Sequence, residues 1–91
     1  MSQSSRFAVF GIGRYGTQIA LALSAKGAEV FTFDVRPVRS ESIKDDVALA
    51  VTLDSTDIKA LETQRVQDMD AAIVAIGENF ESTVLTALNL L

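Results

Sequence analysis

Continuous apolar runs alternate along the chain with segments whose apolar positions recur at helical spacing. The apolar runs are short and are followed by glycine or an acidic residue, which predicts buried β-strands. We expect these strands over residues 6–10, 28–33, 48–53 and 70–76. The segments after them carry apolar residues three or four positions apart, which predicts helices. The helices are expected over residues 15–26, 38–46, 55–66 and 79–91.

The predicted order of elements is βαβαβαβα. Because parallel strands need crossover connections, this order favours a parallel sheet with helices on both faces. Right-handed crossovers then give a Rossmann-like α/β fold with four visible strands. Four strands form only part of a doubly wound sheet, and no Gly, Asn or Pro stop follows the last helix. We therefore expect residues 1–91 to form one domain that is truncated at its C-terminus.

The first strand leads directly into a G-x-G-x-x-G motif made by Gly11, Gly13 and Gly16. A motif of this kind between a strand and a helix is typical of a loop that binds nucleotide phosphates. The first glycine permits the tight turn, the second lets the backbone approach a phosphate, and the third lets the helix pack closely. Arg14 lies inside the motif and favours charge pairing with a phosphate. The alternatives are a glycine-rich turn without a ligand and a surface arginine.

Asp34 follows the second strand, at a distance from Gly16 close to the ~20 residues expected of an acid that binds a ribose hydroxyl. A carboxylate there favours a free 2′-hydroxyl, so NAD(H) or ATP/ADP is expected before NADP. Arg36 complicates this preference, because a guanidinium can stack on adenine or pair with a 2′-phosphate. Its alternative role is that of a solvated loop residue.

The third strand is followed by Asp54 and Ser55. Ligands of parallel sheets bind at the carboxyl ends of the strands, so these residues are candidates for contact with an adenine edge. The alternative is that Asp54, Ser55 or Thr56 caps the next helix, with Ser55 and Thr56 favoured as caps. Asp57 suits the dipole at the start of that helix.

The fourth strand ends in the segment AIGEN, where Gly77 gives room beside a ligand and Glu78 or Asn79 can reach it. The alternative is a turn in which Asn79 caps the last helix. The complete set of candidate cofactor-binding residues is Gly11, Ile12, Gly13, Arg14, Tyr15, Gly16, Asp34, Val35, Arg36, Asp54, Ser55, Ala75, Ile76, Gly77, Glu78 and Asn79.

Composition narrows the classes of function. The chain is 48% hydrophobic, has a net charge of −4, and contains neither cysteine nor histidine. It therefore lacks thiolate chemistry and the commonest general base and metal ligand. The acidic balance argues against nucleic-acid binding. No apolar run is long enough to insert into a membrane, and no signal-peptide pattern is present, so a cytoplasmic protein is expected.

Three segments resemble the N-terminal RCK domain, also called KTN, of the TrkA-N family. They are FAVFGIGRYGTQIALALSAKGAEVFTFD, DSTD and DAAIVAIGENFESTVLTALNLL, of which the last is the most discriminating. The resemblance implies a non-enzymatic regulatory subunit of Trk or Ktr potassium uptake systems or of ligand-gated potassium channels. It also implies phosphate contacts from the glycine motif and Arg14, a ribose contact from Asp34, and an adenine site near Asp54 and Ser55. The far wall would be formed by Gly77, Glu78 and Asn79.

Members of this family bind ATP, ADP or NAD(H) and assemble as dimers that build an octameric ring under a membrane subunit. The resemblance therefore implies a potassium-translocating partner, a homo-dimer, and a cytoplasmic location peripheral to the inner membrane. The stripe formed by Phe80, Val84, Leu88 and Leu91 is expected to be exposed and to mark a dimer contact, the alternative being packing on the sheet. Other functions to be weighed are the cofactor-binding half of an NAD-dependent oxidoreductase and a fragment of an S-adenosylmethionine-binding methyltransferase.

Overall fold

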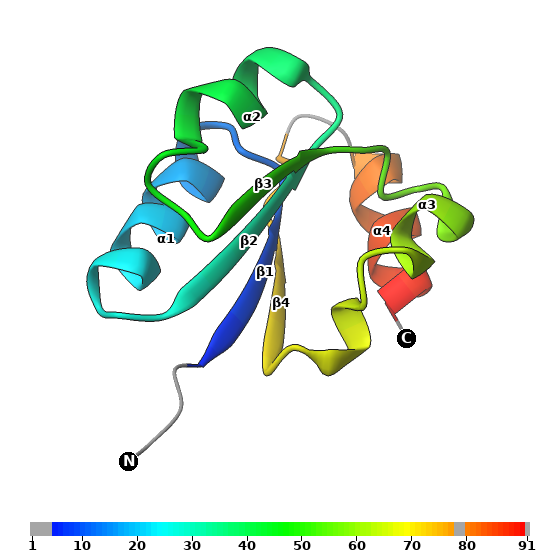
Figure 1. Cartoon of the computed structure of the whole chain (residues 1–91). Coiled ribbons are helices and arrows are strands. Elements are labelled where there is room, and N and C mark those ends of the chain that lie inside the picture. Colours follow the sequence, from blue (N-terminus) through cyan, green and yellow to red (C-terminus); the bar gives the residue numbers. More distant parts are fainter. Residues whose placement is uncertain (1–4, 78–79, 91) are drawn as a thin grey trace.

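The computed structural model describes residues 5–77 and 80–90, and its strands form a parallel sheet in the order β3-β2-β1-β4. The strands are β1 (Arg6–Phe10), β2 (Glu29–Asp34), β3 (Leu49–Thr52) and β4 (Ala71–Val74). The helices are α1 (Arg14–Ala25), α2 (Pro37–Ile43), α3 (Ile58–Glu62) and α4 (Phe80–Leu90), with a short 3-10 helix, η1 (Val66–Asp68), before β4. Helices α1 and α2 cover one face of the sheet, and α3 and α4 cover the other (Figure 1). The predicted Rossmann-like α/β fold is confirmed.

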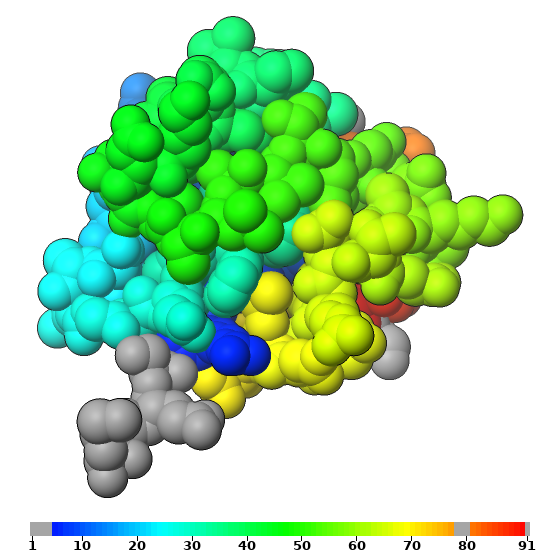
Figure 2. All heavy atoms as spheres, in the orientation of Figure 1, coloured from blue at the N-terminus to red at the C-terminus, as the bar shows by residue number. Residues whose placement is uncertain are grey.

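Each face of the sheet has its own apolar cluster, because successive strand residues point to opposite faces. Val9 of β1 packs with residues of α1 and α2, whereas its neighbours Ala8 and Phe10 pack with Leu61 of α3. The rings of Phe10 and Phe33 stack with their centroids 4.9 Å apart. Little of β1 is visible on the surface in the space-filling view (Figure 2), in agreement with the complete burial of Ala8, Val9 and Phe10. Strand β1 is thus a rigid base for the glycine loop that follows it.

The carboxyl ends of the strands meet at one edge of the sheet. The Gly11 N–H donates to the Phe33 carbonyl at 2.8 Å, and the Ala75 N–H donates to the Phe10 carbonyl at 2.7 Å. The glycine loop after β1 therefore lies between the loops that follow β2 and β4. The chain leaves β1 on one side toward β2 and later reaches β4 on the other side, so this edge is the point where the strand order reverses.

Two of the predicted helices are shorter than expected. Helix α2 ends at Ile43 rather than at residue 46, and it starts at Pro37, whose fixed φ suits the first helical position. Beyond α3 the chain does not continue as the same helix to residue 66, because Arg65 has a φ of 53°. A non-glycine residue in this left-handed region ends a helix. The predicted strands agree with the structure to within two residues at each end.

Helix α3 begins later than the predicted residue 55. Its cap is Asp57, whose extended backbone (φ −92°, ψ 106°) precedes the first helical turn. The Asp57 carboxylate accepts hydrogen bonds from the backbone N–H groups of Lys59 and Ala60, at 3.0 and 3.4 Å. The prediction that Ser55 and Thr56 are the caps is therefore wrong, because Asp57 stands closer to the unpaired N–H groups of the first turn.

Helix α4 presents an apolar face to solvent. Val84 and Leu88 are 39% and 59% exposed, as expected for this stripe, and the adjacent Leu85 is 40% exposed. Leu90, on another side of the helix, packs against the apolar cluster around Phe10. The side chain of Phe80 and the whole of Leu91, the other two stripe residues, lie outside the described part of the chain. Among residues 5–77 and 80–90, none of the helices combines the length and hydrophobicity needed to cross a bilayer.

Candidate functional site

A cavity of about 170 Å³ opens at the carboxyl edge of the sheet. It is bounded by the loops that follow all four strands and by the first turn of α4. This is the place where open parallel sheets bind their ligands. The lining residues are Gly11, Phe33, Asp34, Val35, Arg39, Leu53, Asp54, Ser55, Thr56, Ala75, Ile76 and Ser82.

The glycine loop is held in close contact with its surroundings. Gly11 has a φ of 94°, and a Cβ atom there would lie 2.7 Å from the carbonyl oxygen of Ala75. A Cβ atom on Gly16 would lie 1.7 Å from the carbonyl oxygen of Gly11. Gly13 precedes α1, and no side chain caps this helix at that position. The first N–H groups of α1 thus lack intrahelical acceptors and are arranged to receive an anion.

Asp34 braces this loop from the end of β2. Its side chain is 3% exposed. One carboxylate oxygen accepts from the Ile12 N–H at 2.7 Å, and the other accepts from the Arg36 N–H at 2.8 Å. The Arg39 guanidinium lies 3.5 Å from the first of these oxygens. Asp34 therefore joins the glycine loop to the start of α2, a role that its position in the sequence does not reveal.

The remaining residues of the glycine motif have different surroundings. The Ile12 side chain is buried in the cluster beneath α1 and α2, and this residue does not line the cavity. Arg14 and Tyr15 are exposed on the first turn of α1 and do not line the cavity. Both residues belong to the N-terminal turn of α1. The loop thus combines a buried anchor with an exposed cationic side chain.

The loop after β3 forms a second wall of the cavity. One oxygen of the Asp54 carboxylate accepts from the Thr56 N–H at 3.0 Å and from the Thr56 hydroxyl at 2.6 Å. The Ser55 hydroxyl is 2.6 Å from the Thr86 hydroxyl in a buried contact. Asp54 therefore stabilises the turn while remaining exposed, whereas the Ser55 side chain is engaged by α4.

The candidate residues are only partly brought together. Gly11, Asp34, Val35, Asp54, Ser55, Ala75 and Ile76 all line the cavity. Arg36 and Gly77 are exposed and do not line it, and a Cβ atom on Gly77 would meet no heavy atom within 4 Å. Glu78 and Asn79 lie outside the described residues. Sequence reasoning missed Phe33, Arg39, Leu53, Thr56 and Ser82 as lining residues.

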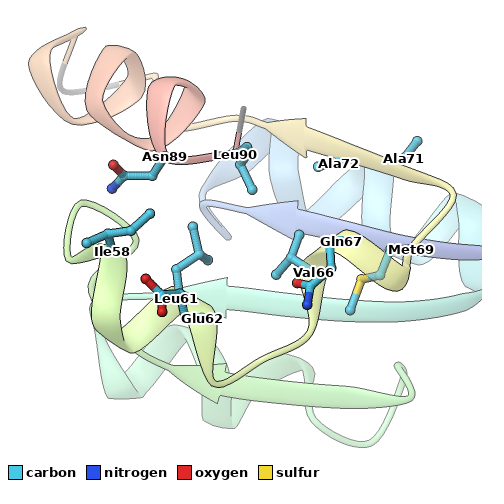
Figure 3. Close-up of a pocket in the computed structure, with 10 residues that line it drawn as sticks. All are labelled: Ile58, Leu61, Glu62, Val66, Gln67, Met69, Ala71, Ala72, Asn89 and Leu90. Atoms are coloured by element: carbon cyan, nitrogen blue, oxygen red, sulfur yellow. The ribbon is translucent and has the colours of Figure 1, made fainter.

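A larger hollow of about 400 Å³ lies elsewhere, between α3, η1, β4 and α4. Leu61 and Leu90 point into it from opposite sides (Figure 3). Its other lining residues are mostly apolar and include no glycine loop or basic side chain. The helix that begins there, at Ile58, is the five-residue α3, whose first turn is already capped by Asp57. A nucleotide needs free donors for its phosphates. The smaller cavity is therefore the candidate site, despite its size.

Comparison with known proteins identifies the family. Residues 7–91 match the family model described as the TrkA-N domain. The chain belongs to the TrkA-N domain family. The resemblance predicted from the sequence is thereby confirmed. In the described part of this TrkA-N domain, no group of three or more histidine, cysteine, aspartate or glutamate side chains is placed to hold a metal ion.

Three curated relatives of this TrkA-N domain are proteins of Ktr systems. It is 40% identical over 84 residues to Ktr system potassium uptake protein C of Bacillus subtilis (strain 168), covering 92% of this chain and 38% of the relative. It is 31% identical over 88 residues to Ktr system potassium uptake protein A of the same organism, covering 97% of this chain and 40% of the relative. It is 26% identical over 83 residues to Ktr system potassium uptake protein A of Vibrio alginolyticus, covering 91% of this chain and 38% of the relative. The chain thus spans about two fifths of the length of these relatives.

Proposed function

We propose that this TrkA-N domain is a non-catalytic regulatory module that binds an adenine nucleotide, ATP/ADP or NAD(H), and controls potassium transport. The observation that carries the proposal is the glycine loop at the carboxyl edge, braced from beneath by the buried Asp34 carboxylate. A loop held in this way offers preorganised backbone donors to a phosphate. The potassium role rests on the relatives, whose names place them in potassium uptake systems.

The cavity volume limits how much of the ligand is enclosed. Its 170 Å³ is less than the roughly 300–1,000 Å³ of typical small-molecule sites. We therefore assign the enclosed part to the nucleoside and the open part, over Gly13 and Arg14, to the phosphates. The Asp34 carboxylate has three partners within the protein: the backbone N–H groups of Ile12 and Arg36 and the Arg39 guanidinium. Because a carboxylate has about four acceptor positions, one position is left for a ribose hydroxyl. Asp54 would face the adenine, with Gly77, Glu78 and Asn79 on the other wall.

The proposed partner is a potassium-translocating membrane subunit, beside which the module acts from the cytoplasm, peripheral to the inner membrane. The exposed apolar face of α4 supports a homo-dimer as the building block of a larger ring. Such a module works by binding its ligands with different affinity in two assembly states. No catalytic residue is required for this role.

Thermal unfolding of the chain with ATP, ADP, NAD⁺, NADH, NADPH and S-adenosylmethionine tests the proposal. A ligand that binds only the folded state adds about 2.7 kcal/mol to the free energy of unfolding at 100 times its Kd. We expect this stabilisation with ATP or ADP, and we expect Arg14→Ala to remove most of it. The matched control is Arg6→Ala at the opposite end of β1, where Arg6 makes an exposed ion pair with Glu29.

The ligand pattern decides among the candidate functions. Stabilisation by S-adenosylmethionine alone would contradict a phosphate-binding loop, as would the absence of any shift. Stabilisation by NAD(H) that does not depend on Arg14 would fit both a regulatory module and the cofactor-binding half of an oxidoreductase, and the full-length gene would then decide between them. An equal loss of ligand stabilisation in Arg6→Ala and Arg14→Ala would show a general effect of charge.

A further inference from the structure

Helix α4 is fastened to the loop after β3 by polar contacts. The hydroxyl groups of Ser55 and Thr86 are 2.6 Å apart, and these residues are only 8% and 0% exposed. The Asn89 side-chain amide donates to the carbonyl oxygens of Ser55 and Thr56, at 3.1 Å each. These contacts join residues 31 to 34 positions apart in the sequence. They fix α4 to a segment to which it is not adjacent in the chain.

The same helix also holds the loop after β4. The Thr83 hydroxyl donates to the Ile76 carbonyl at 2.5 Å. Ser82, in the first turn of α4, lines the 170 Å³ cavity together with Ile76 and Ser55. Two walls of the cavity are thus bonded to one helix. The helix presents Val84, Leu85 and Leu88 on its exposed face.

A buried pair of hydroxyl groups restricts the relative movement of two elements more than an apolar contact does. An apolar surface can slide, whereas a buried hydroxyl that loses its partner carries the cost of desolvation. The loop after β3 therefore cannot change position without either moving α4 or leaving Ser55 and Thr86 unsatisfied. Any ligand that orders this loop also favours the docked position of α4.

We propose that Thr86, with Ser55 and Asn89, links occupancy of the cavity to the docking of α4. Nucleotide in the cavity and the docked helix stabilise each other, so the outer face of α4 reports whether the site is filled. Because such coupling is reciprocal, weakening the dock weakens the binding of nucleotide by the same factor. Thr86 acts here as a positioning residue for the cavity wall. The inference rests on the proposed nucleotide binding in this cavity.

The experiment combines two measurements on the 91-residue chain. Calorimetry gives the Kd for ATP and ADP, and amide hydrogen exchange gives the protection of residues 81–90 with and without these ligands. In the unaltered protein we expect ligand to slow the exchange of α4 by about fivefold or more. In Thr86→Val we expect the Kd to rise by a similar factor and the ligand-dependent protection to disappear.

Three further variants separate coupling from simple damage. Thr86→Ser keeps the hydroxyl and is expected to restore both effects. The double variant Ser55→Ala/Thr86→Val removes both hydroxyls, leaves none unsatisfied, and is expected to fold but to lose the coupling. Thr63→Val removes an exposed hydroxyl whose contacts are local, donation to the Ala60 carbonyl and acceptance from the Gln64 side-chain amide, and is expected to change neither measurement.

The outcomes distinguish this inference from the function on which it rests. If neither ATP nor ADP binds the unaltered chain, the proposed function and the coupling both fall. If nucleotide binds while exchange in α4 is unaffected, the coupling alone is overturned. It is also overturned if Thr86→Val speeds exchange but leaves the Kd unchanged, because Thr86 then serves only the stability of the helix.

Discussion

Gly16 occupies a position where the backbone of one element touches that of another. The Gly11 carbonyl oxygen lies only 1.7 Å from the place where a Cβ would stand. Flexible side chains can move aside for an added methyl group, but a carbonyl in a hydrogen-bonded turn cannot. The close approach of α1 to the end of β1 therefore depends on the absence of a single atom.

Gly16→Ala is expected to lower the free energy of unfolding by at least about 3 kcal/mol, since overpacking costs typically about 1–3 kcal/mol even where side chains can adjust. Urea denaturation measures the change, and nucleotide binding should be lost with it. Gly77→Ala is the matched control for the stability measurement alone, because its Cβ would meet nothing within 4 Å. Equal stability of the two variants would show that α1 can move away from β1 at little cost.

Single residues also set the limit of what the sequence could predict at this scale. The glycine motif and Asp34 were found because their spacing is local and regular. The hydrogen bond from the Ile12 N–H to the Asp34 carboxylate was not predicted, because it depends on how the folded chain orients this carboxylate toward the glycine loop. Arg39 was missed for the same reason, since only the first turn of α2 brings its guanidinium to Asp34.

At the scale of elements, α3 is the shortest of the α-helices in the described part of the chain. It has only five residues, Ile58–Glu62, and isolated helices of that length are unstable. Two features hold it: the cap supplied by Asp57 and the burial of Leu61 against the sheet. The helix therefore depends strongly on its cap.

Asp57→Ala is expected to reduce the free energy of unfolding by about 1 kcal/mol, the usual cost of losing an N-cap. For a chain of this size the melting temperature should fall by roughly 4–8 °C. Asp45→Ala, in the exposed turn after α2, removes the same charge and serves as the control. An identical decrease in both variants would attribute the effect to net charge and not to the cap.

The long apolar runs explain why the strands were predicted well and α3 was not. A buried strand is recognised in the sequence by continuous hydrophobicity, as in residues 7–10 of β1. The segment after β3 contains Asp54, Ser55, Thr56 and Asp57, each of which is competent to cap a helix. Tertiary and local contacts decide which of them caps the helix. The Ser55 hydroxyl contacts Thr86 of α4, and the Asp54 carboxylate accepts from the Thr56 hydroxyl, so neither side chain is available as the cap.

At the scale of the whole molecule, the two sides of α4 differ in what covers them. One side is bonded to the loops of the cavity, and the other leaves Val84, Leu85 and Leu88 exposed. Neighbouring exposed apolar side chains on one helix are typical of contact surfaces. A two-fold symmetric contact would bury this face of both copies at once.

Leu88→Lys is expected to raise the dissociation constant of the proposed homo-dimer by at least about tenfold, because burying a leucine contributes about 1.5–3 kcal/mol and each 1.4 kcal/mol is tenfold. Sedimentation velocity over a concentration series measures this. Leu21→Lys makes the same change on α1, where Leu21 is 39% exposed, and should have little effect. A dimer that survives Leu88→Lys but not Leu21→Lys would place the contact on α1.

The pairing of β1 with β4 determines when the cavity can form during synthesis of the chain. Arg6 and Asp70, which meet at the start of these strands, are 64 residues apart. Ala75, Ile76 and Ser82 form part of the cavity wall, so the cavity is complete only when the segment after β4 has docked. Such distant contacts form late in folding. On the ribosome, a nascent chain that has emerged only as far as α3 would carry the complete glycine motif and yet have no site to fill.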